Sequence, residues 1–165
     1  MQRRPVGSSG LSVSRLGLGT LTWGDGTGPD EAAAQLGAFA DAGGTLVETC
    51  DAYAGGESQR MLGQALADGP GRDELVLAGR TTLPAGGAAR GTLLAALDAS
   101  LARIGTDHLD LWQLPAVPDP AGAVPLDEAL TAVQVAVLSG RARYAGLVAP
   151  RGWQLATAVE RARTV

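Results

Sequence analysis

Three side chains of this sequence have the types and spacing that acid and base chemistry requires: Tyr53, Glu48 and Arg80. Glu48 and Arg80 each close a short apolar run, and Tyr53 follows Glu48 by five residues. A phenol beside a carboxylate and a guanidinium can donate or accept a proton during a reaction. The same residues could instead form a salt bridge that only neutralises buried charge. Asp51 and Glu57 flank Tyr53, and we expect both acids to be solvated.

Composition excludes several other chemistries. The chain has 165 residues, 45% hydrophobic and 18% charged, which is typical of one folded domain. All 13 basic residues are arginine, so no lysine is present to form a Schiff base or a P-loop. One cysteine and one histidine cannot form an internal disulfide or a His/Cys zinc site, and we expect no bound metal.

Charge and hydropathy limit the partners. The net charge is −4, with acidic and basic residues interspersed, so no basic stripe is present for nucleic acid. No apolar stretch approaches the roughly 18 residues of a membrane span, and the N-terminus lacks the apolar core of a signal peptide. We therefore expect a cytoplasmic protein that binds neither nucleic acid nor membrane.

Apolar runs of strand length alternate with longer stretches of helical spacing along the chain. A Gly-Ser-Ser-Gly turn within residues 2–13 predicts a β-hairpin that precedes these strands and helices. We expect strands at 15–19, 45–48, 75–78, 109–114 and 143–148, and helices at 29–42, 57–67, 92–103, 126–138 and 153–163. Five strand–helix units predict a parallel sheet with right-handed crossovers in a single domain, residues 1–165. Periodicity alone leaves open whether this sheet is a partial barrel or an open doubly wound sheet.

Four stretches of the chain resemble the aldo/keto reductase family, in the family's order. They are the hairpin and first strand at residues 6–20, ETCDAY at 48–53 followed by Ser58, DHLDLWQL at 107–114, and GRARYAG at 140–146. The resemblance implies the N-terminal portion of an eight-unit (β/α) barrel. We therefore expect an α/β fold: a partial TIM-type barrel of about five βα units preceded by an N-terminal hairpin.

The resemblance also implies roles for residues at the carboxyl ends of the strands, where barrel enzymes keep their chemistry. The family's proton-donating tyrosine corresponds to Tyr53 and its aspartate to Glu48. Its lysine corresponds to Arg80 and its histidine to Pro115. Arginine keeps the charge but does not pass protons, and proline offers no hydrogen-bond donor. We expect Tyr53, Glu48 and Arg80 to be the catalytic residues of a degenerate tetrad.

Cofactor and substrate contacts follow from the same resemblance. Val148 and Ala149 occupy positions where the family has Ser and Asn against the nicotinamide of NADPH. Neither forms side-chain hydrogen bonds, and the family's main contacts with the adenosine phosphate lie beyond the matched portion. We therefore expect no cofactor, with NADPH as the alternative. For substrate binding we expect Thr20, Trp23 and Trp112, although both tryptophans could equally serve core packing.

These departures predict a redox-inactive, aldo/keto reductase-like enzyme that performs acid/base chemistry. The reaction would be a dehydration, cyclisation or isomerisation of a small carbonyl-containing metabolite, in small-molecule biosynthesis. Two alternatives stay open: a non-catalytic pseudoenzyme or partner subunit, and an NADPH-dependent reductase whose site is rebuilt by oligomerisation. Because five strands cannot close an eight-strand barrel, we expect a symmetric homodimer that covers the open edges. The alternative is that the chain is a fragment or a degenerate relative of a longer reductase.

Overall fold

The computed structural model contains a hairpin followed by a parallel sheet. The described residues are 1–83, 87–115, 126–148 and 151–162. Strands β1 (Arg3–Pro5) and β2 (Ser12–Ser14) pair antiparallel and form the hairpin. The sheet has the strand order β3-β4-β5-β6-β7, which is also their order along the chain. Its strands are β3 (Gly17–Gly19), β4 (Leu46–Cys50), β5 (Val76–Arg80), β6 (Leu109–Pro115) and β7 (Ala142–Val148).

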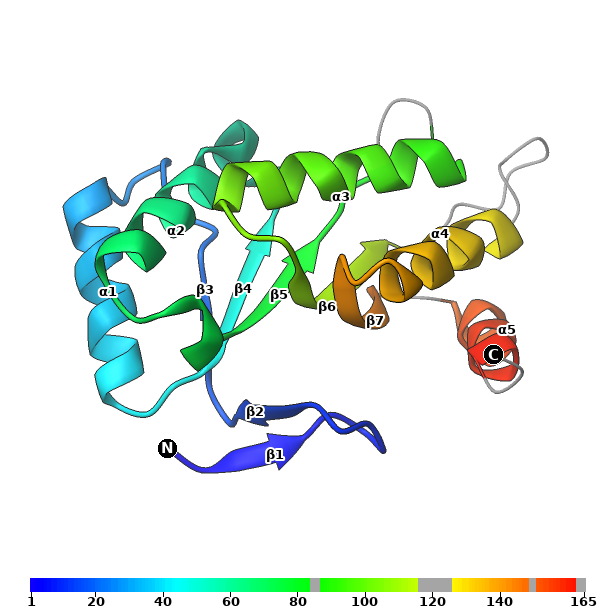
Figure 1. Ribbon diagram of the computed structural model, residues 1–165, viewed down its shortest axis with the longest axis horizontal. Coiled ribbons are helices and arrows are strands. Elements are labelled where there is room, and N and C mark those ends of the chain that lie inside the picture. The colour runs from blue at the N-terminus through cyan, green and yellow to red at the C-terminus, as the bar shows by residue number, and fades with distance from the viewer. Residues whose placement is uncertain (84–86, 116–125, 149–150, 163–165) are drawn as a thin grey trace.

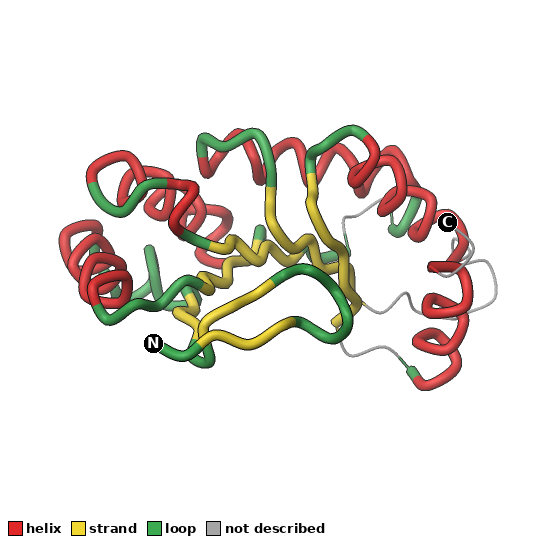
Figure 2. Tube along the Cα trace, turned by 60° about the horizontal axis from the view of Figure 1, so that its bottom comes forward, coloured by secondary structure: helices red, strands yellow, loops and turns green. Residues whose placement is uncertain are grey.

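Helices connect the parallel strands and lie along the outer side of the arc that the strands form (Figure 1, Figure 2). The α-helices are α1 (Pro29–Asp41), α2 (Glu57–Asp68), α3 (Arg90–Ile104), α4 (Leu126–Leu138) and α5 (Gly152–Ala162). Two 3-10 helices, η1 (Tyr53–Gly56) and η2 (Arg72–Glu74), precede α2 and β5. The predicted α/β class is confirmed: five strand–helix units behind a hairpin form a partial (β/α) barrel.

Local sequence explains where α1 begins and ends. Pro29 occupies its first turn, where a missing N–H costs no hydrogen bond, and Asp30 and Glu31 place negative charge at the positive end of the helix dipole. After the helix, Gly43 adopts φ +76° and donates its N–H to the carbonyl of Ala40. This conformation favours glycine, so Gly43 stops the helix and sends the chain into β4.

The hairpin is attached to the end of the sheet from which the parallel strands start (Figure 1). The Ser14 N–H donates to Oγ1 of Thr45 at 3.0 Å, and Oγ of Ser14 accepts from the N–H groups of Thr45 and Leu46 at 2.9 and 3.1 Å. All three bonds lie in buried or partly buried surroundings. The hairpin is therefore fixed to the amino-terminal end of the sheet, whereas barrel enzymes hold their active sites at the carboxyl end.

The strand register decides which side chains face the open side of the sheet. Cys50 pairs with Arg80, and Arg80 pairs with Gln113. Side chains alternate along a strand, so Glu48 lies on the same face as Cys50, two residues further along β4. Residues in register share a face, so Arg80 and Gln113 lie on that face as well. The alternate positions, such as Leu77 and Trp112, are completely buried.

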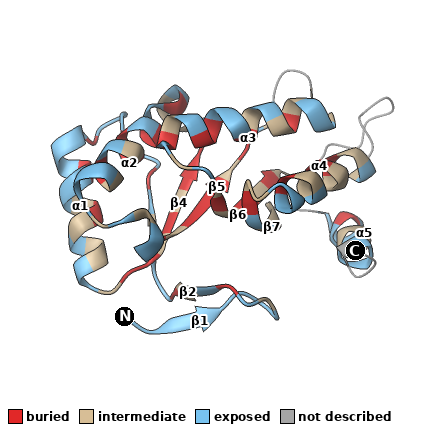
Figure 3. Ribbon diagram, viewed as in Figure 1, coloured by how far each residue is buried: buried red, intermediate tan, exposed pale blue. Residues whose placement is uncertain are grey.

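The core lies between the sheet and the helices. Figure 3 shows buried residues concentrated on β4 and β5 and on the facing sides of the helices. The largest fully buried side chains of this core include Trp23, Trp112, Leu36, Leu62, Leu77, Leu93 and Leu97. Among the described helices, none is both long enough and apolar enough to cross a membrane.

Gly63 of α2 packs against the end of α3, and we expect a methyl group added there to destabilise the fold. A Cβ at residue 63 would lie 2.5 Å from the carbonyl oxygen of Ile104 and 2.9 Å from its carbonyl carbon. Since both atoms belong to the backbone, the two helices must separate. We expect Gly63→Ala to lower the free energy of unfolding by about 1–3 kcal/mol, measured by urea denaturation.

Gly37→Ala is the matched control, because Gly37 is also a helical glycine. A Cβ at residue 37 of α1 would meet no heavy atom within 4 Å. We expect this variant to be neutral or more stable by up to about 1 kcal/mol, since alanine favours helix over glycine. An equal loss of stability in both variants would contradict the packing explanation.

Candidate active site

The carboxyl ends of β4 and β5 bring the three predicted catalytic residues together. The Tyr53 hydroxyl donates to the Glu48 carboxylate, whose oxygens lie 3.1 and 3.3 Å away. The Arg80 guanidinium donates to the same hydroxyl, and its central carbon lies 5.5 Å from the centre of the Tyr53 ring. Nε of Arg80 lies 2.7 Å from Oε1 of Glu48, which makes these two an ion pair. We call these three residues the Tyr53 cluster.

Tyr53 lies directly before a turn of left-handed conformations. Ala54, Gly55 and Gly56 have φ angles of 47°, 63° and 92°. Ala54 is the one residue other than glycine with positive φ in the described part of the chain. This conformation costs about 1–2 kcal/mol for an L-amino acid, so contacts around the turn must hold it.

The environment of Tyr53 keeps its phenol protonated. Burial raises the pKa of Tyr53, and the negative charge of Glu48 raises it further. Arg80 acts in the opposite direction, but the resulting pKa stays above the ordinary value of tyrosine. At neutral pH Tyr53 is therefore available as a proton donor, and the adjacent cation can stabilise the phenolate left behind.

Thr20, Trp23 and Trp112, the residues predicted to bind a substrate, are all 0% exposed. The indole N–H of Trp23 donates to Gln35 at 2.9 Å, and that of Trp112 donates to Oγ1 of Thr81 at 2.8 Å. The structure therefore places these residues in the core, with their polar atoms already bonded. Their contact with a substrate stays a prediction.

Pro115 ends β6 and is in register with Val148 at the end of β7. Neither side chain has a hydrogen-bond donor. Ala149, the other residue expected near a nicotinamide, lies outside the described residues. Gln113, two residues before Pro115, shares the face of Arg80 and provides an amide at this end of the sheet.

Hydrogen bonds of Asp51 and Ser58 were missed by sequence reasoning. Oδ1 of Asp51 accepts from both the N–H and the hydroxyl of Thr82, each at 2.9 Å, so this acid is not merely solvated. The buried Ser58 hydroxyl lies 2.8 Å from the carbonyl oxygen of Thr20 and 2.7 Å from its Oγ1. The sequence places Asp51 and Thr82 just after two neighbouring strands, where short polar side chains can meet. This placement could have predicted their hydrogen bond.

The single cysteine and the single histidine lie outside the Tyr53 cluster. Burial raises the pKa of the Cys50 thiol, which makes it a poor nucleophile at neutral pH. Nδ1 of His108 lies 2.6 Å from the Asp107 carboxylate, before the start of β6. Within the described residues, His, Cys, Asp and Glu side chains form no group of three that could hold a metal ion.

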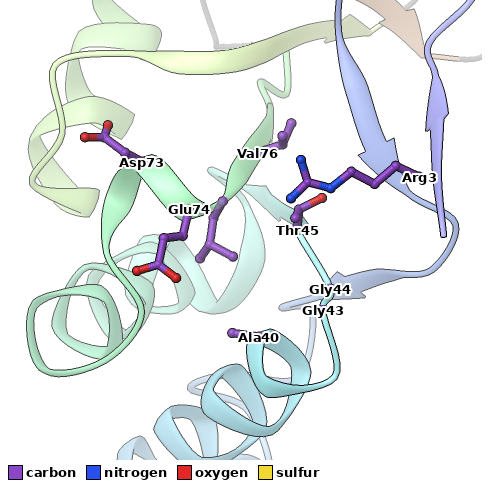
Figure 4. Close-up of a pocket in the computed structure, with 9 residues that line it drawn as sticks. Arg3, Ala40, Gly43, Gly44, Thr45, Asp73, Glu74 and Val76 are labelled. Atoms are coloured by element: carbon purple, nitrogen blue, oxygen red, sulfur yellow. The ribbon is translucent and has the colours of Figure 1, made fainter. Parts of the chain in front are cut away.

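A pocket of about 300 Å³ lies at the opposite end of the sheet, where β4 and β5 start (Figure 4). Arg3 points into it toward Thr45 and Val76, and Asp73 and Glu74 lie at its other side. No member of the Tyr53 cluster lines this pocket. It is therefore separate from the candidate active site.

Comparison with known proteins identifies the family. Residues 15–164 match the model of the Aldo/keto reductase family. Aldo-keto reductase YhdN of Bacillus subtilis is 31% identical over 89% of this chain and 46% of its own length. Protein tas of Escherichia coli is 30% identical over 89% of this chain and 51% of its own length. The chain thus spans about half the length of the curated relatives it matches.

Solved structures agree with this match. A thermostable aldo-keto reductase in complex with the inhibitor epalrestat has a TM-score of 0.83 and 29% identity, covering 97% of this chain and 58% of that one. The holo form of an aldo-keto reductase from Bacillus halodurans has a TM-score of 0.77 and 28% identity, covering 89% and 50%. Both structures support the assignment of a partial barrel.

The expectation of no cofactor is wrong. The family match and the holo and inhibitor-bound neighbours point to a nicotinamide cofactor instead. The expectation rested on Val148 and Ala149, which cannot form side-chain hydrogen bonds to a nicotinamide, and on phosphate contacts that lie beyond the matched portion. The loss of individual contacts does not show that the cofactor is lost. Several relatives, such as Aldo-keto reductase YhdN and Norsolorinic acid reductase B, are named as reductases, and the comparisons give no support to a redox-inactive dehydration, cyclisation or isomerisation.

We expect the two charged neighbours of Tyr53 to shift its pKa in opposite directions. Glu48→Gln removes the negative charge and should lower the pKa of Tyr53, whereas Arg80→Met removes the positive charge and should raise it. Absorbance titration of the phenolate measures both shifts. Tyr144→Phe provides a clean background, because the chain has two tyrosines. Shifts in the same direction, or no shifts, would contradict the electrostatic coupling of the cluster.

Proposed function

Because this chain belongs to the aldo/keto reductase family, we propose that it serves in the nicotinamide-dependent reduction of a carbonyl group, with Tyr53 as proton donor. The observation that carries this proposal is the Tyr53 hydroxyl, which contacts both Glu48 and Arg80 at the carboxyl end of the sheet. This chain covers half of its relatives' length, so we propose that residues outside it complete the site.

The described residues suit the reacting end of a nicotinamide cofactor rather than its phosphates. Tyr53 and Gln113 provide a hydroxyl and an amide at the carboxyl end of the sheet, where the ring and the carbonyl substrate would be held. Arg80 is already paired with Glu48 at 2.7 Å, so its charge is not free for a phosphate. When bound, the cofactor supplies a hydride to the carbonyl carbon. We propose that its phosphates are held by residues outside the described set.

Tyr53 performs the proton transfer in this proposal. Its raised pKa keeps the hydroxyl protonated through neutral pH, and the proton passes to the carbonyl oxygen as that atom gains negative charge. The O–H must first turn from Glu48 toward the substrate. Arg80 then stabilises the phenolate but does not return a proton, because guanidinium stays charged. Water at this half-exposed edge, where the Arg80 side chain is 34% exposed, reprotonates Tyr53.

Orientation of the carbonyl differs from the family pattern. The position that the resemblance assigns to a histidine is Pro115, which cannot donate a hydrogen bond. Tyr53 and Arg80 therefore provide the hydrogen bonds to the carbonyl oxygen. We expect carbonyl groups that are already electron-poor, such as aldehydes, to react best, because they need less polarisation.

We expect Tyr53→Phe to lower kcat/KM for NADPH-dependent reduction of a small aldehyde by about 10²–10⁴-fold, because it removes the proton donor. The loss of NADPH absorbance measures the rate. Tyr144→Phe is the matched control and should retain activity, since Tyr144 lies on β7 outside the cluster. The proposal is overturned if the assembled protein, with the residues that complete its site, fails to bind NADPH up to millimolar concentrations in a fluorescence titration, or if Tyr53→Phe reduces the aldehyde at the wild-type rate.

We also propose that a second copy of this chain covers the open edges of the sheet. In the described structure, β3 and β7 each pair with a strand on one side only. Leu16 and Leu21, on either side of β3, are 66% and 62% exposed. Unpaired strand edges and exposed leucines both favour association.

Sedimentation velocity tests this association directly. We expect a species of twice the chain mass of 16.6 kDa at micromolar concentrations. Leu16→Asp combined with Leu21→Asp should dissociate it, because charged side chains oppose burial at an interface. Ala67→Asp on α2 is a control of the same kind, since Ala67 is exposed on a helix that packs against the inner strand β4, away from both open edges. A wild-type chain that sediments as a stable monomer would exclude the dimer.

A further inference from the structure

We propose that Asp51 is a positioning residue that aligns Tyr53 with Arg80 by tying the end of β4 to the end of β5. This inference rests on the proposed role of Tyr53 as proton donor. Asp51 directly follows β4 and precedes Tyr53 by two residues, so it lies on the short link between β4 and Tyr53. No part of its proposed role requires contact with a substrate.

Asp51 holds the neighbouring strand end at two points. Its backbone N–H donates to the carbonyl oxygen of Arg80 at 3.2 Å. Its carboxylate oxygen Oδ1 accepts from both the N–H and the hydroxyl of Thr82, each at 2.9 Å. The backbone and the side chain of one residue therefore fix the residues at both ends of the segment 80–82. Hydrogen bonds to a charged acceptor are stronger than neutral ones, which suits this role at a partly exposed edge.

The segment that Asp51 holds is itself anchored in the core. The Thr81 N–H donates to the carbonyl oxygen of Gln113 at 3.0 Å, and Oγ1 of Thr81 accepts from the buried indole of Trp112 at 2.8 Å. The end of β5 is thus immobilised against β6. Asp51 extends this rigid frame to the loop that bears Tyr53.

The lengths of the partner side chains explain why such a device is needed. Arg80 and Glu48 reach Tyr53 through several rotatable bonds, so their contacts carry a large conformational entropy cost. Their alignment therefore depends on a constant separation between the backbones of β4 and β5. Directly after Tyr53, the left-handed turn at Ala54 adds strain that tends to release the loop. The hydrogen bonds of Asp51 oppose this movement of the loop, because Asp51 lies only three residues before the strained Ala54.

The far end of the same loop is fixed independently. Ser58, at the second position of α2, is completely buried and its hydroxyl contacts Thr20. Loss of the Asp51 contact would therefore loosen the segment between Asp51 and Ser58 without detaching α2. The predicted effect is local to Tyr53 and does not require unfolding.

Titration of Tyr53 in the Tyr144→Phe background tests this inference. We expect Asp51→Ala to lower the pKa of Tyr53 toward the ordinary tyrosine value, because the loosened phenol becomes more exposed to solvent and moves away from Glu48. Asp51→Asn is the matched control: it keeps an oxygen acceptor for Thr82 and should titrate like its parent. Amide exchange of Thr82, followed by NMR, should be about tenfold faster in Asp51→Ala and near normal in Asp51→Asn.

Thr82→Val provides a second route if Asp51→Ala fails to fold. It removes the hydroxyl donor and retains the backbone donor at an exposed position, so we expect an intermediate pKa for Tyr53. The positioning role is overturned if Asp51→Ala and Thr82→Val both titrate like their parent, or if Asp51→Asn shifts as far as Asp51→Ala. These measurements use neither substrate nor cofactor. Failure of the reductase assay would therefore leave them standing, and the two proposals can fail separately.

Discussion

The ion pair between Glu48 and Arg80 is the interaction on which the candidate site depends. The two side chains come from adjacent parallel strands and lie 2.7 Å apart, with 28% and 34% of their surfaces exposed. The two charges act on the pKa of Tyr53 in opposite directions, and burial, the largest contribution, raises it. Either charge alone would make the phenol a stronger or a weaker acid. The register of β4 against β5 therefore decides which two charges modulate the acidity of Tyr53.

The order of the elements was predictable from sequence because it depends on local signals. Buried strands appear as short apolar runs, and helices end at glycines such as Gly43 and Gly105, both of which have positive φ. Once the strands are known to be parallel and consecutive, their carboxyl ends must meet at one edge. The meeting of Glu48, Tyr53 and Arg80 follows from that topology, so this part of the site was also accessible.

The parts that sequence did not reveal depend on side-chain depth and direction. Trp23 and Trp112 lie near strand ends, but whether an indole faces a pocket or the core depends on which face of the strand it occupies and on packing with distant helices. The bond between Asp51 and Thr82 joins residues 31 positions apart through a single carboxylate oxygen. The cofactor expectation failed for another reason. It relied on residues that are absent from this chain, and an absent contact does not show that a ligand is absent.

Stability and acid/base chemistry depend on opposite ends of the sheet, because the hairpin is bonded to the start of β4. Bonds between Ser14 and Thr45 consolidate one end of the sheet, whereas the titrating groups of the Tyr53 cluster lie at the other. Substitutions at the hairpin end can alter thermal tolerance without changing the electrostatics around Tyr53. Lineages of this fold can therefore adapt to temperature and to new substrates through different sets of mutations, and so an engineer can combine changes of both kinds with little interference between them.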